Sequence, residues 1–211
     1  MAFDLEEQEQ IAELKQFWNQ YGKLIVTLVV AALVALAGTQ AWRYHRASQS
    51  EQAAALFTKF HEAVRKNDVA EVRALGKQLI DGFGSTAYGP MAALSLARTN
   101  YENGDPAAAA SQLQWAIDNA KDGETSDLAR LRLAGIRLDE KKYDDALKLL
   151  EASHGAAMEA LYADLRGDVM VAQGRSDEAR AAYKLALEKS SPNSSYRNVV
   201  QIKLDALGAA K

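Results

Sequence analysis

An uninterrupted apolar run near the N-terminus constrains this chain more than any other feature. The run covers residues 24–41 and contains no charged side chain. At a rise of about 1.5 Å per residue it spans roughly 27 Å, close to the ~30 Å hydrocarbon core of a bilayer. The sequence therefore predicts a transmembrane helix over residues 24–42, followed by one large domain over residues 43–211.

Two other interpretations of the run are open at this level. Ala35-Leu36-Ala37 matches the small-residue motif of a cleaved signal peptide, and a core helix of a soluble domain can also be apolar. A signal peptide normally begins with a short, positive segment, whereas here a long acidic segment precedes the run. A core helix usually keeps a polar stripe, and this run has none beyond Thr27. A permanent anchor is therefore favoured.

The segment over residues 1–23 predicts an acidic, amphipathic head. Apolar side chains recur there at helical spacing: Ile11, Leu14, Phe17, Trp18 and Tyr21. We expect a helix over about residues 5–22 that lies along the membrane surface. Trp18 and Tyr21 before the run, and Trp42 and Tyr44 after it, are typical of an aromatic belt.

The charges beside the run do not decide its orientation. Lys15 and Lys23 precede it, and Arg43 and Arg46 follow it. The positive-inside rule therefore gives a near tie, with a slight preference for a cytoplasmic domain.

The composition of residues 43–211 excludes several classes of function. The 23 basic and 23 acidic side chains balance, which argues against a nucleic-acid-binding surface. The absence of cysteine excludes disulfides, thiolate metal sites and a cysteine nucleophile. Proline is rare and alanine and leucine dominate, so the domain is predicted to be all-α.

A pattern of small residues repeats along the domain. A first copy has Ala97, Gly104, Ala109, Leu113 and Ala116. The pattern returns 37 residues later with Ala134, Ala146 and Leu150, and 33 residues after that with Gly167, Gly174, Ala179, Tyr183 and Ala186. A period near 34 with a turn between two small-residue rows is typical of tetratricopeptide repeats. Small residues at these places allow two antiparallel helices to approach closely.

The repeats predict a small α-solenoid of three to four helical hairpins. A weaker hairpin precedes the three clear ones, with helices over about residues 43–66 and 68–80. The first of these helices is expected to continue from the membrane span. Residues 194–207 are expected to form a C-terminal capping helix, because their apolar face is mixed.

Motifs for catalysis are nearly absent, and no catalytic, cofactor-binding or metal-binding residue is expected. Residues 82–87 match G-x-G-x-x-A by letter, but a helix rather than a strand precedes them, so an inter-helix loop is favoured. His45, His61 and His154 are isolated and are expected at the surface or the membrane edge. An enzyme is therefore not expected.

A repeat solenoid binds protein segments in the groove formed by the first helix of each hairpin. The repeat register places eleven candidates there: Met91, Leu94, Arg98, Tyr101, Leu128, Leu131, Leu138, Leu161, Asp164, Asp168 and Val171. The set is mixed and rather apolar, so extended or partly unfolded apolar segments are the expected ligands. Each leucine can equally belong to the core of the repeats.

Several blocks of the sequence resemble one known family. They are Glu13-Leu14-Lys15-Gln16-Phe17-Trp18 and Gly22-Lys23 before the span, Trp42-Arg43-Tyr44 after it, Tyr88-Gly89, Gln112-Leu113-Gln114, and Ala163-Asp164-Leu165-Arg166-Gly167-Asp168. On the strength of these blocks, the chain resembles the YfgM family, the tetratricopeptide-like ancillary subunits of the bacterial SecYEG translocon. The resemblance covers the whole chain.

The resemblance implies a single-pass protein of the bacterial inner membrane with a cytoplasmic N-terminus and a periplasmic domain. It implies three protein partners: the SecYEG translocon, the membrane-anchored periplasmic chaperone PpiD and exported polypeptides. The lipid bilayer is a further expected partner, through Leu24 to Trp42. No catalytic residue or cofactor follows from the resemblance. The alternative is a structural scaffold for envelope assembly or cell division that uses the same groove for a folded partner.

Overall fold

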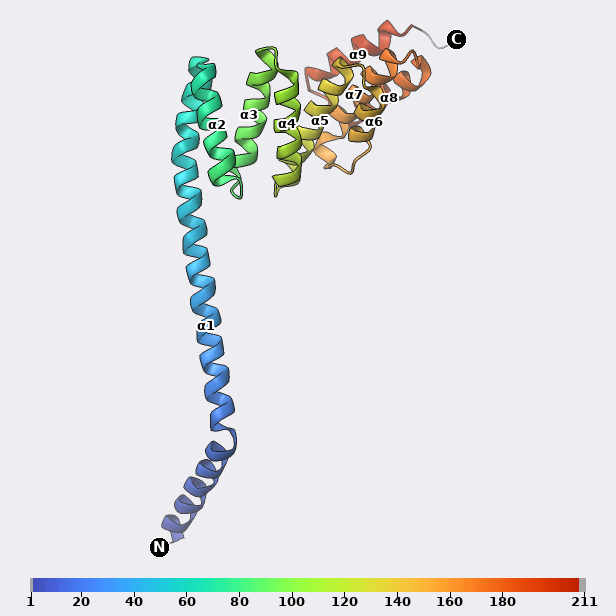
Figure 1. The fold of residues 1–211 in the computed structure, drawn as a ribbon. Coiled ribbons are helices and arrows are strands. Elements are labelled where there is room, and N and C mark those ends of the chain that lie inside the picture. The colour runs from blue at the N-terminus through green and yellow to red at the C-terminus, as the bar shows by residue number, and fades with distance from the viewer. Residues whose placement is uncertain (1, 209–211) are drawn as a thin grey trace. The chain divides into compact units, whose positions relative to one another are not determined.

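The computed structural model describes residues 2–208, and side chains from residue 10 onward; every long element in this range is helical (Figure 1). The first helix, α1, covers Ala2–Lys66. Two compact units divide the chain, one over residues 1–49 and one over residues 50–211. The second unit contains the last turns of α1 and all later helices.

The first unit contains the apolar run predicted to be a membrane span. An 18-residue window of α1 has a mean hydropathy of 2.2, and none of it is buried. By length and composition, α1 is the one described helix that could cross a membrane. A core helix would be largely covered by its neighbours, so the interpretation of this run as a core helix is wrong.

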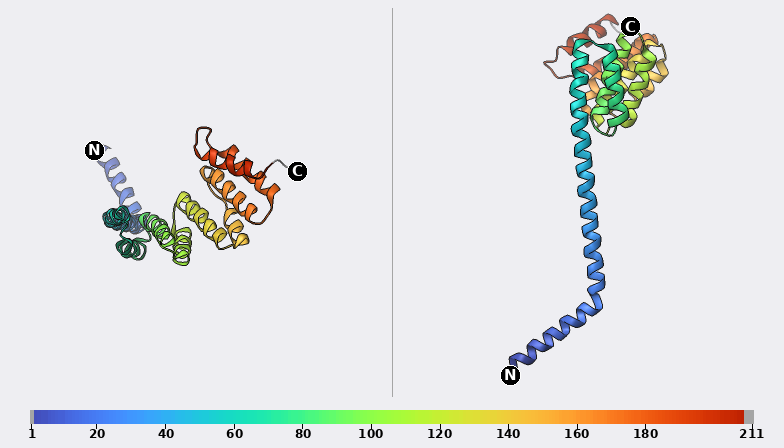
Figure 2. Two further views of the ribbon diagram at one scale, coloured as in Figure 1. Left: turned by 90° about the horizontal axis from the view of Figure 1, so that it is seen from above. Right: turned by 60° about the vertical axis from the view of Figure 1, so that its left-hand side comes forward.

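The second unit is a series of antiparallel helices in chain order (Figures 1 and 2). Its elements after α1 are α2 (Val69–Phe83), α3 (Tyr88–Glu102), α4 (Pro106–Asn119), α5 (Gly123–Asp139), α6 (Tyr143–Leu150), the short 3-10 helix η1 (Ala156–Met158), α7 (Glu159–Ala172), α8 (Ser176–Lys189) and α9 (Tyr196–Ala206). The described residues therefore form four hairpins and a closing helix, which confirms the all-α solenoid.

Each hairpin turns on one residue with a left-handed backbone. These residues are Asn67, Gly104, Lys141 and Gly174, with φ of 56°, 81°, 59° and 75°. After each one, the next amide donates to a carbonyl five residues back, as from Asp105 to Asn100 at 2.9 Å and from Arg175 to Met170 at 2.9 Å. This is the Schellman motif that ends a helix. The turn thus recurs at the predicted spacing and includes the weaker first hairpin.

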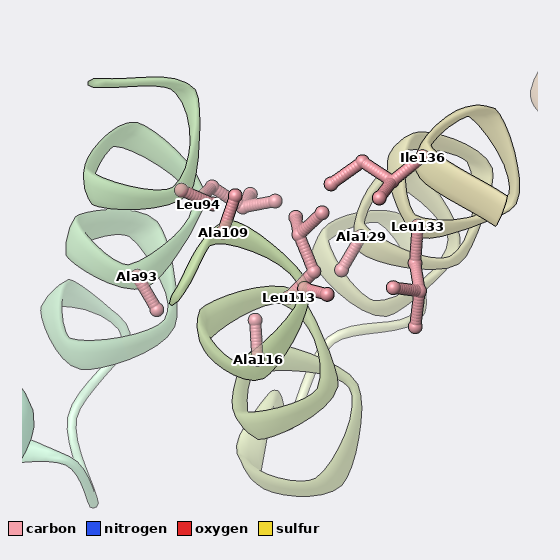
Figure 3. Packing of buried hydrophobic residues seen from close by; sticks show 10 residues of the cluster. Ala93, Leu94, Ala109, Leu113, Ala116, Ala129, Leu133 and Ile136 are labelled. Atoms are coloured by element: carbon pink, nitrogen blue, oxygen red, sulfur yellow. The ribbon is translucent and has the colours of Figure 1, made fainter. Parts of the chain in front are cut away.

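The core is divided into four clusters, and each one joins a hairpin to the next first helix. One cluster contains Phe60 and Leu79 from the first hairpin together with Leu96 of α3. The cluster in Figure 3 combines α3, α4 and α5, with Leu113 between Ala93 and Leu133. Further clusters join α5, α6 and α7, and then α7, α8 and α9. Stability is therefore built from contacts between neighbours, as in other repeat proteins.

The small residues of the repeat lie where the helices approach most closely. Ala97, Ala109, Ala134 and Ala146 are all 2% exposed or less. Gly167 is the extreme case, because a Cβ added to it would lie only 2.3 Å from Cε1 of Tyr183. The close-approach role predicted for these positions is confirmed.

The third hairpin departs from the regular repeat. α6 has only 8 residues, and a loop with η1 replaces the rest of a second helix. This loop is fixed to α5, since Asp127 accepts a hydrogen bond from the Gly155 amide at 2.9 Å. His154 stacks on Tyr162 with ring centroids 3.9 Å apart, and its side chain is only 11% exposed. The expectation that His154 lies at the surface is therefore wrong.

The first helices of the hairpins form the inner row of the solenoid. α3 contacts α5, and α5 contacts α7, whereas no comparable contact joins α4 to α6 or α6 to α8 in the described part of the chain. Helices on the inner side of a curved array lie closer together than those outside. The eleven candidate groove residues all lie on α3, α5 and α7, and so on this inner row.

Candidate functional site

A groove of about 390 Å³ opens between α3 and α5 on the inner row. Ala97, Arg98, Tyr101, Leu113, Arg132, Gly135, Ile136 and Asp139 line it. Leu113 of α4 forms the floor together with Ala97 and Ile136, and all three are buried. The polar side chains stand at the rim, so the groove combines an apolar base with charged walls, as binding sites commonly do.

One end of the groove carries two cations. Arg98 Nε donates to Glu102 Oε1 at 2.7 Å in an exposed pair, and this pairing raises the pKa of Arg98. The Arg132 guanidinium donates to the Leu94 carbonyl oxygen at 3.3 Å. Burial lowers the pKa of Arg132, and the nearby charge of Arg98 lowers it further. Both groups are cationic at neutral pH.

The other end of the groove carries a hydrogen-bonded pair between the two helices. The Tyr101 hydroxyl donates to Asp139 Oδ2 at 2.5 Å. This hydrogen bond raises the pKa of Tyr101, because the bond holds the phenol proton. Asp139 therefore fixes Tyr101 across the groove and places a negative charge at the end away from the arginines.

The structure brings two of the predicted candidates, Arg98 and Tyr101, into this groove. Leu94 is 8% exposed and belongs to the core. Leu128, Leu131 and Leu138 are partly buried and pack against core clusters. For these four leucines the structure supports a packing role.

The candidates on α7 divide into two kinds. Asp164 is buried and Asp168 is half-buried, and both accept hydrogen bonds from Lys203 Nζ of α9, at 2.9 and 2.7 Å. Tyr196 and Tyr183 donate to Asp164 and Asp168, at 2.5 and 2.7 Å. The capping helix α9 therefore contacts both carboxylates through Lys203. Met91 on α3 and Val171 on α7 remain exposed, and Leu161 is half-buried.

Burial and hydrogen bonding shift the pKa values of Tyr183, Tyr196 and Lys203 in this cluster of side chains around Asp164 and Asp168. Burial raises the pKa of Tyr183 and of Tyr196, and the hydrogen bonds to Asp168 and Asp164 raise both further. Burial lowers the pKa of Lys203, but its hydrogen bonds to the two carboxylates, together with their negative charges, outweigh that effect and raise the pKa overall. The cluster is a structural link between α7 and α9.

Sequence reasoning missed Arg132, Gly135, Ile136 and Asp139. The candidates on α5 were found by adding the repeat length of 37 residues to those on α3. This procedure selects the same side of both helices. A groove between two parallel neighbours is lined by facing flanks, which are opposite sides of the two helices. Shifting the register by one residue on α5 would have identified Arg132, Ile136 and Asp139. Gly135 lies 37 residues after Arg98, in the unshifted register, and was left out of the predicted set.

The described residues contain no group of three metal-ligating side chains that could hold an ion. Residues 82–87 form the end of α2 and the loop before α3, with Thr86 Oγ1 donating to the Phe83 carbonyl at 2.7 Å. The inter-helix loop predicted there is confirmed.

The apolar part of α1 is bordered by exposed aromatic side chains. Trp18 and Tyr21 are 55% and 44% exposed, and Trp42 and Tyr44 are 59% and 77% exposed. The Arg46 guanidinium lies 4.7 Å from the centre of the Trp42 ring. Such amphipathic side chains at both borders are typical of a helix at a membrane interface.

Comparison with known proteins covers nearly the whole chain. The family described as Tetratricopeptide repeat-like domain matches residues 15–209. A protein of Neisseria gonorrhoeae is 34% identical over 98% of this chain and 100% of its own length. Relatives in Haemophilus influenzae (30% identical, 90% of this chain and 93% of the relative) and Escherichia coli (27%, 95% and 96%) are similar. All three are named ancillary SecYEG translocon subunit.

These relatives fit the structure in two respects. Their name and the repeat-like domain point to a non-catalytic adaptor, and a translocon subunit with one apolar N-terminal helix fits a single-pass protein of the inner membrane. Full-length similarity and a matching repeat domain place the chain in one family. The chain therefore belongs to the YfgM family, the tetratricopeptide-like ancillary subunits of the SecYEG translocon.

Proposed function

We propose that this protein is a membrane-anchored protein-binding module that associates with the SecYEG translocon and assists a periplasmic chaperone of the PpiD type. The observation that carries the proposal is the full-length similarity to proteins named ancillary SecYEG translocon subunit. The exposed apolar helix and the repeat domain supply the two physical parts that such a role needs.

In this proposal residues 1–23 lie in the cytoplasm, residues 24–42 cross the inner membrane, and residues 43–211 lie in the periplasm. The anchor keeps the repeat domain close to the channel exit. Tethering raises the effective concentration of a binding surface near its ligand without any new contact. Weak binding by the domain is then sufficient to capture segments that emerge from the channel.

The inner row of the solenoid is the proposed contact surface for exported polypeptides. The groove between α3 and α5 offers an apolar floor, rim charges and space for side chains of an extended segment. The exposed Met91 and Val171 add apolar surface on the same row of helices. Binding in this way needs no catalytic group.

Co-purification tests the association. The full chain with a C-terminal tag is extracted from membranes in a mild detergent, and the bound proteins are identified by mass spectrometry. We expect translocon subunits and a PpiD-type chaperone. A form lacking residues 1–42, exported with a cleavable leader, is the control and should retain far less translocon. Recovery of envelope-assembly or division factors without translocon subunits would favour a structural scaffold.

Protease access tests the orientation. Protease added to intact spheroplasts should digest residues 43–211, because the proposal puts them outside the inner membrane. A cytoplasmic marker protein should survive in the same sample. Protection of the domain until lysis would contradict the proposed topology.

A further inference from the structure

Arg132, one of the two cations at one end of the α3/α5 groove, has no carboxylate partner among the described residues. Arg132 makes one hydrogen bond, to the Leu94 carbonyl oxygen, and forms no ion pair with any side chain of residues 10–208. Arg98 is close enough for its charge to lower the pKa of Arg132. Two like charges therefore face one groove, and an anion placed between them would relieve their repulsion.

Glu102, the carboxylate that pairs with Arg98, is weakly held. Glu102 pairs with Arg98 across one helical turn, and the two side chains are 55% and 72% exposed. Exposed pairs of this kind contribute little, because water and salt screen the two charges. A ligand carboxylate that reaches both guanidinium groups can therefore displace Glu102 from Arg98 at small cost.

The floor of the groove leaves room for an apolar side chain. Gly135 lies on the α5 wall, and a Cβ added to it would meet no atom within 4 Å. Ala97, Leu113 and Ile136 surround this space with apolar atoms. At the far end, Asp139 repels anions while it accepts the Tyr101 hydrogen bond. The groove is thus polarised along its length.

We propose that the α3/α5 groove binds a polypeptide segment in which a carboxylate stands next to a large apolar residue. The apolar side chain fills the space beside Gly135, and the carboxylate lies between Arg98 and Arg132. The carboxylate is that of an acidic side chain within the segment; a free C-terminus at the same place is the alternative that the test distinguishes. The inference rests on the proposed function, because it specifies which segments of client polypeptides the domain selects.

The test uses the full chain in detergent micelles and fluorescein-labelled peptides, with binding followed by fluorescence anisotropy. The first peptide, Gly-Ser-Gly-Leu-Glu-Gly-Ser-Gly with an amidated end, carries an internal carboxylate. Its Gln counterpart lacks the charge. A third peptide ends in Leu with a free carboxylate, and a fourth is its amide. Comparing the two pairs separates a side-chain carboxylate from a C-terminal one.

The expected result is a preference for carboxylate that depends on the two arginines. The Glu peptide should bind about tenfold more tightly than its Gln counterpart, as expected for a charge-assisted hydrogen bond. A preference confined to the free-ended peptide would overturn the assignment to a side-chain carboxylate. Arg132→Gln should remove most of this preference and leave binding of the neutral peptide nearly unchanged. Lys77→Gln is the matched control: it removes one positive charge from an exposed side chain of α2 and should alter nothing.

Blocking the floor tests the apolar half of the site. Gly135→Leu should abolish binding of all four peptides while the variant stays folded, since the space at Gly135 is open and leucine favours a helix. Circular dichroism verifies folding. Equal affinity of the charged and neutral peptides for the wild-type protein would overturn the proposal, as would an equal loss for both peptides in Arg132→Gln.

The translocon co-purification separates this inference from the proposed function. If the protein retains translocon association but shows no preference for carboxylate peptides, the inference is wrong and the proposed function is still supported. Carboxylate preference without translocon association supports the inference and rejects the function.

Discussion

At the scale of single residues, the contact between Gly167 and Tyr183 sets the spacing of α7 and α8. Gly167→Ala places a methyl group where Tyr183 already lies, and Tyr183 is held by its hydrogen bond to Asp168. We expect the free energy of unfolding to fall by about 2 kcal/mol. Urea denaturation monitored by circular dichroism measures it. Gly135→Ala is the control and should gain about 0.5–1 kcal/mol, since it meets open space in a helix.

Lys141 is the least favourable of the four turn residues. It adopts φ of 59°, in the left-handed region where two equivalent turns have glycine. Lys141→Gly should raise the free energy of unfolding by about 0.5–1 kcal/mol, because the relief of backbone strain exceeds the extra entropy of the unfolded chain. Thermal unfolding measures this gain. Gly174→Ala should shift stability in the opposite direction, and a loss from Lys141→Gly would show that Lys141 makes a contact worth more than the strain.

At the scale of elements, α9 is attached to α7 through Lys203. Lys203→Met keeps the apolar stem but leaves the buried Asp164 without its cation. We expect a loss of about 2 kcal/mol, as for a charged group that loses its hydrogen-bond partner. Amide exchange of α9 should rise more than that of α3, since core clusters link only neighbouring hairpins. Equal loosening of both helices would contradict this neighbour-only coupling.

The same attachment predicts a loss of stability at alkaline pH. The folded state raises the pKa of Tyr183, Tyr196 and Lys203 above their ordinary values of 10.0 and 10.5. The folded state therefore binds the protons of these three groups more tightly than the unfolded state does. The resulting stabilisation is complete below about pH 10 and is lost as the pH rises through the pKa values of the folded state. Urea midpoints at pH 8 and pH 11 measure the slope. Tyr196→Phe should flatten it, and an unchanged slope would mean that Tyr196 does not contribute.

At the scale of the whole molecule, the repeat unit is expected to fold without the anchor. The four core clusters draw on residues from Leu56 onward. Removal of residues 1–42 should leave a soluble, monodisperse helical domain that no longer sediments with membranes. Circular dichroism, gel filtration and membrane fractionation test this. Aggregation of the truncated domain would mean that the anchor contributes to folding, and an unchanged membrane activity would count against tethering.

The sequence by itself determined the elements, because their causes are local. The apolar run from Leu24 predicts a membrane span by its length and composition, and Gly104 and Gly174 mark turns whose backbone favours glycine. The alanines at repeat spacing predicted which faces approach. The tertiary structure alone decided which side chains share a groove. Arg132 and Asp139 face Arg98 and Tyr101 only because α5 packs parallel to α3 with its opposite flank inward. It likewise decided that α9 covers Asp164, a long-range pairing with no local signature.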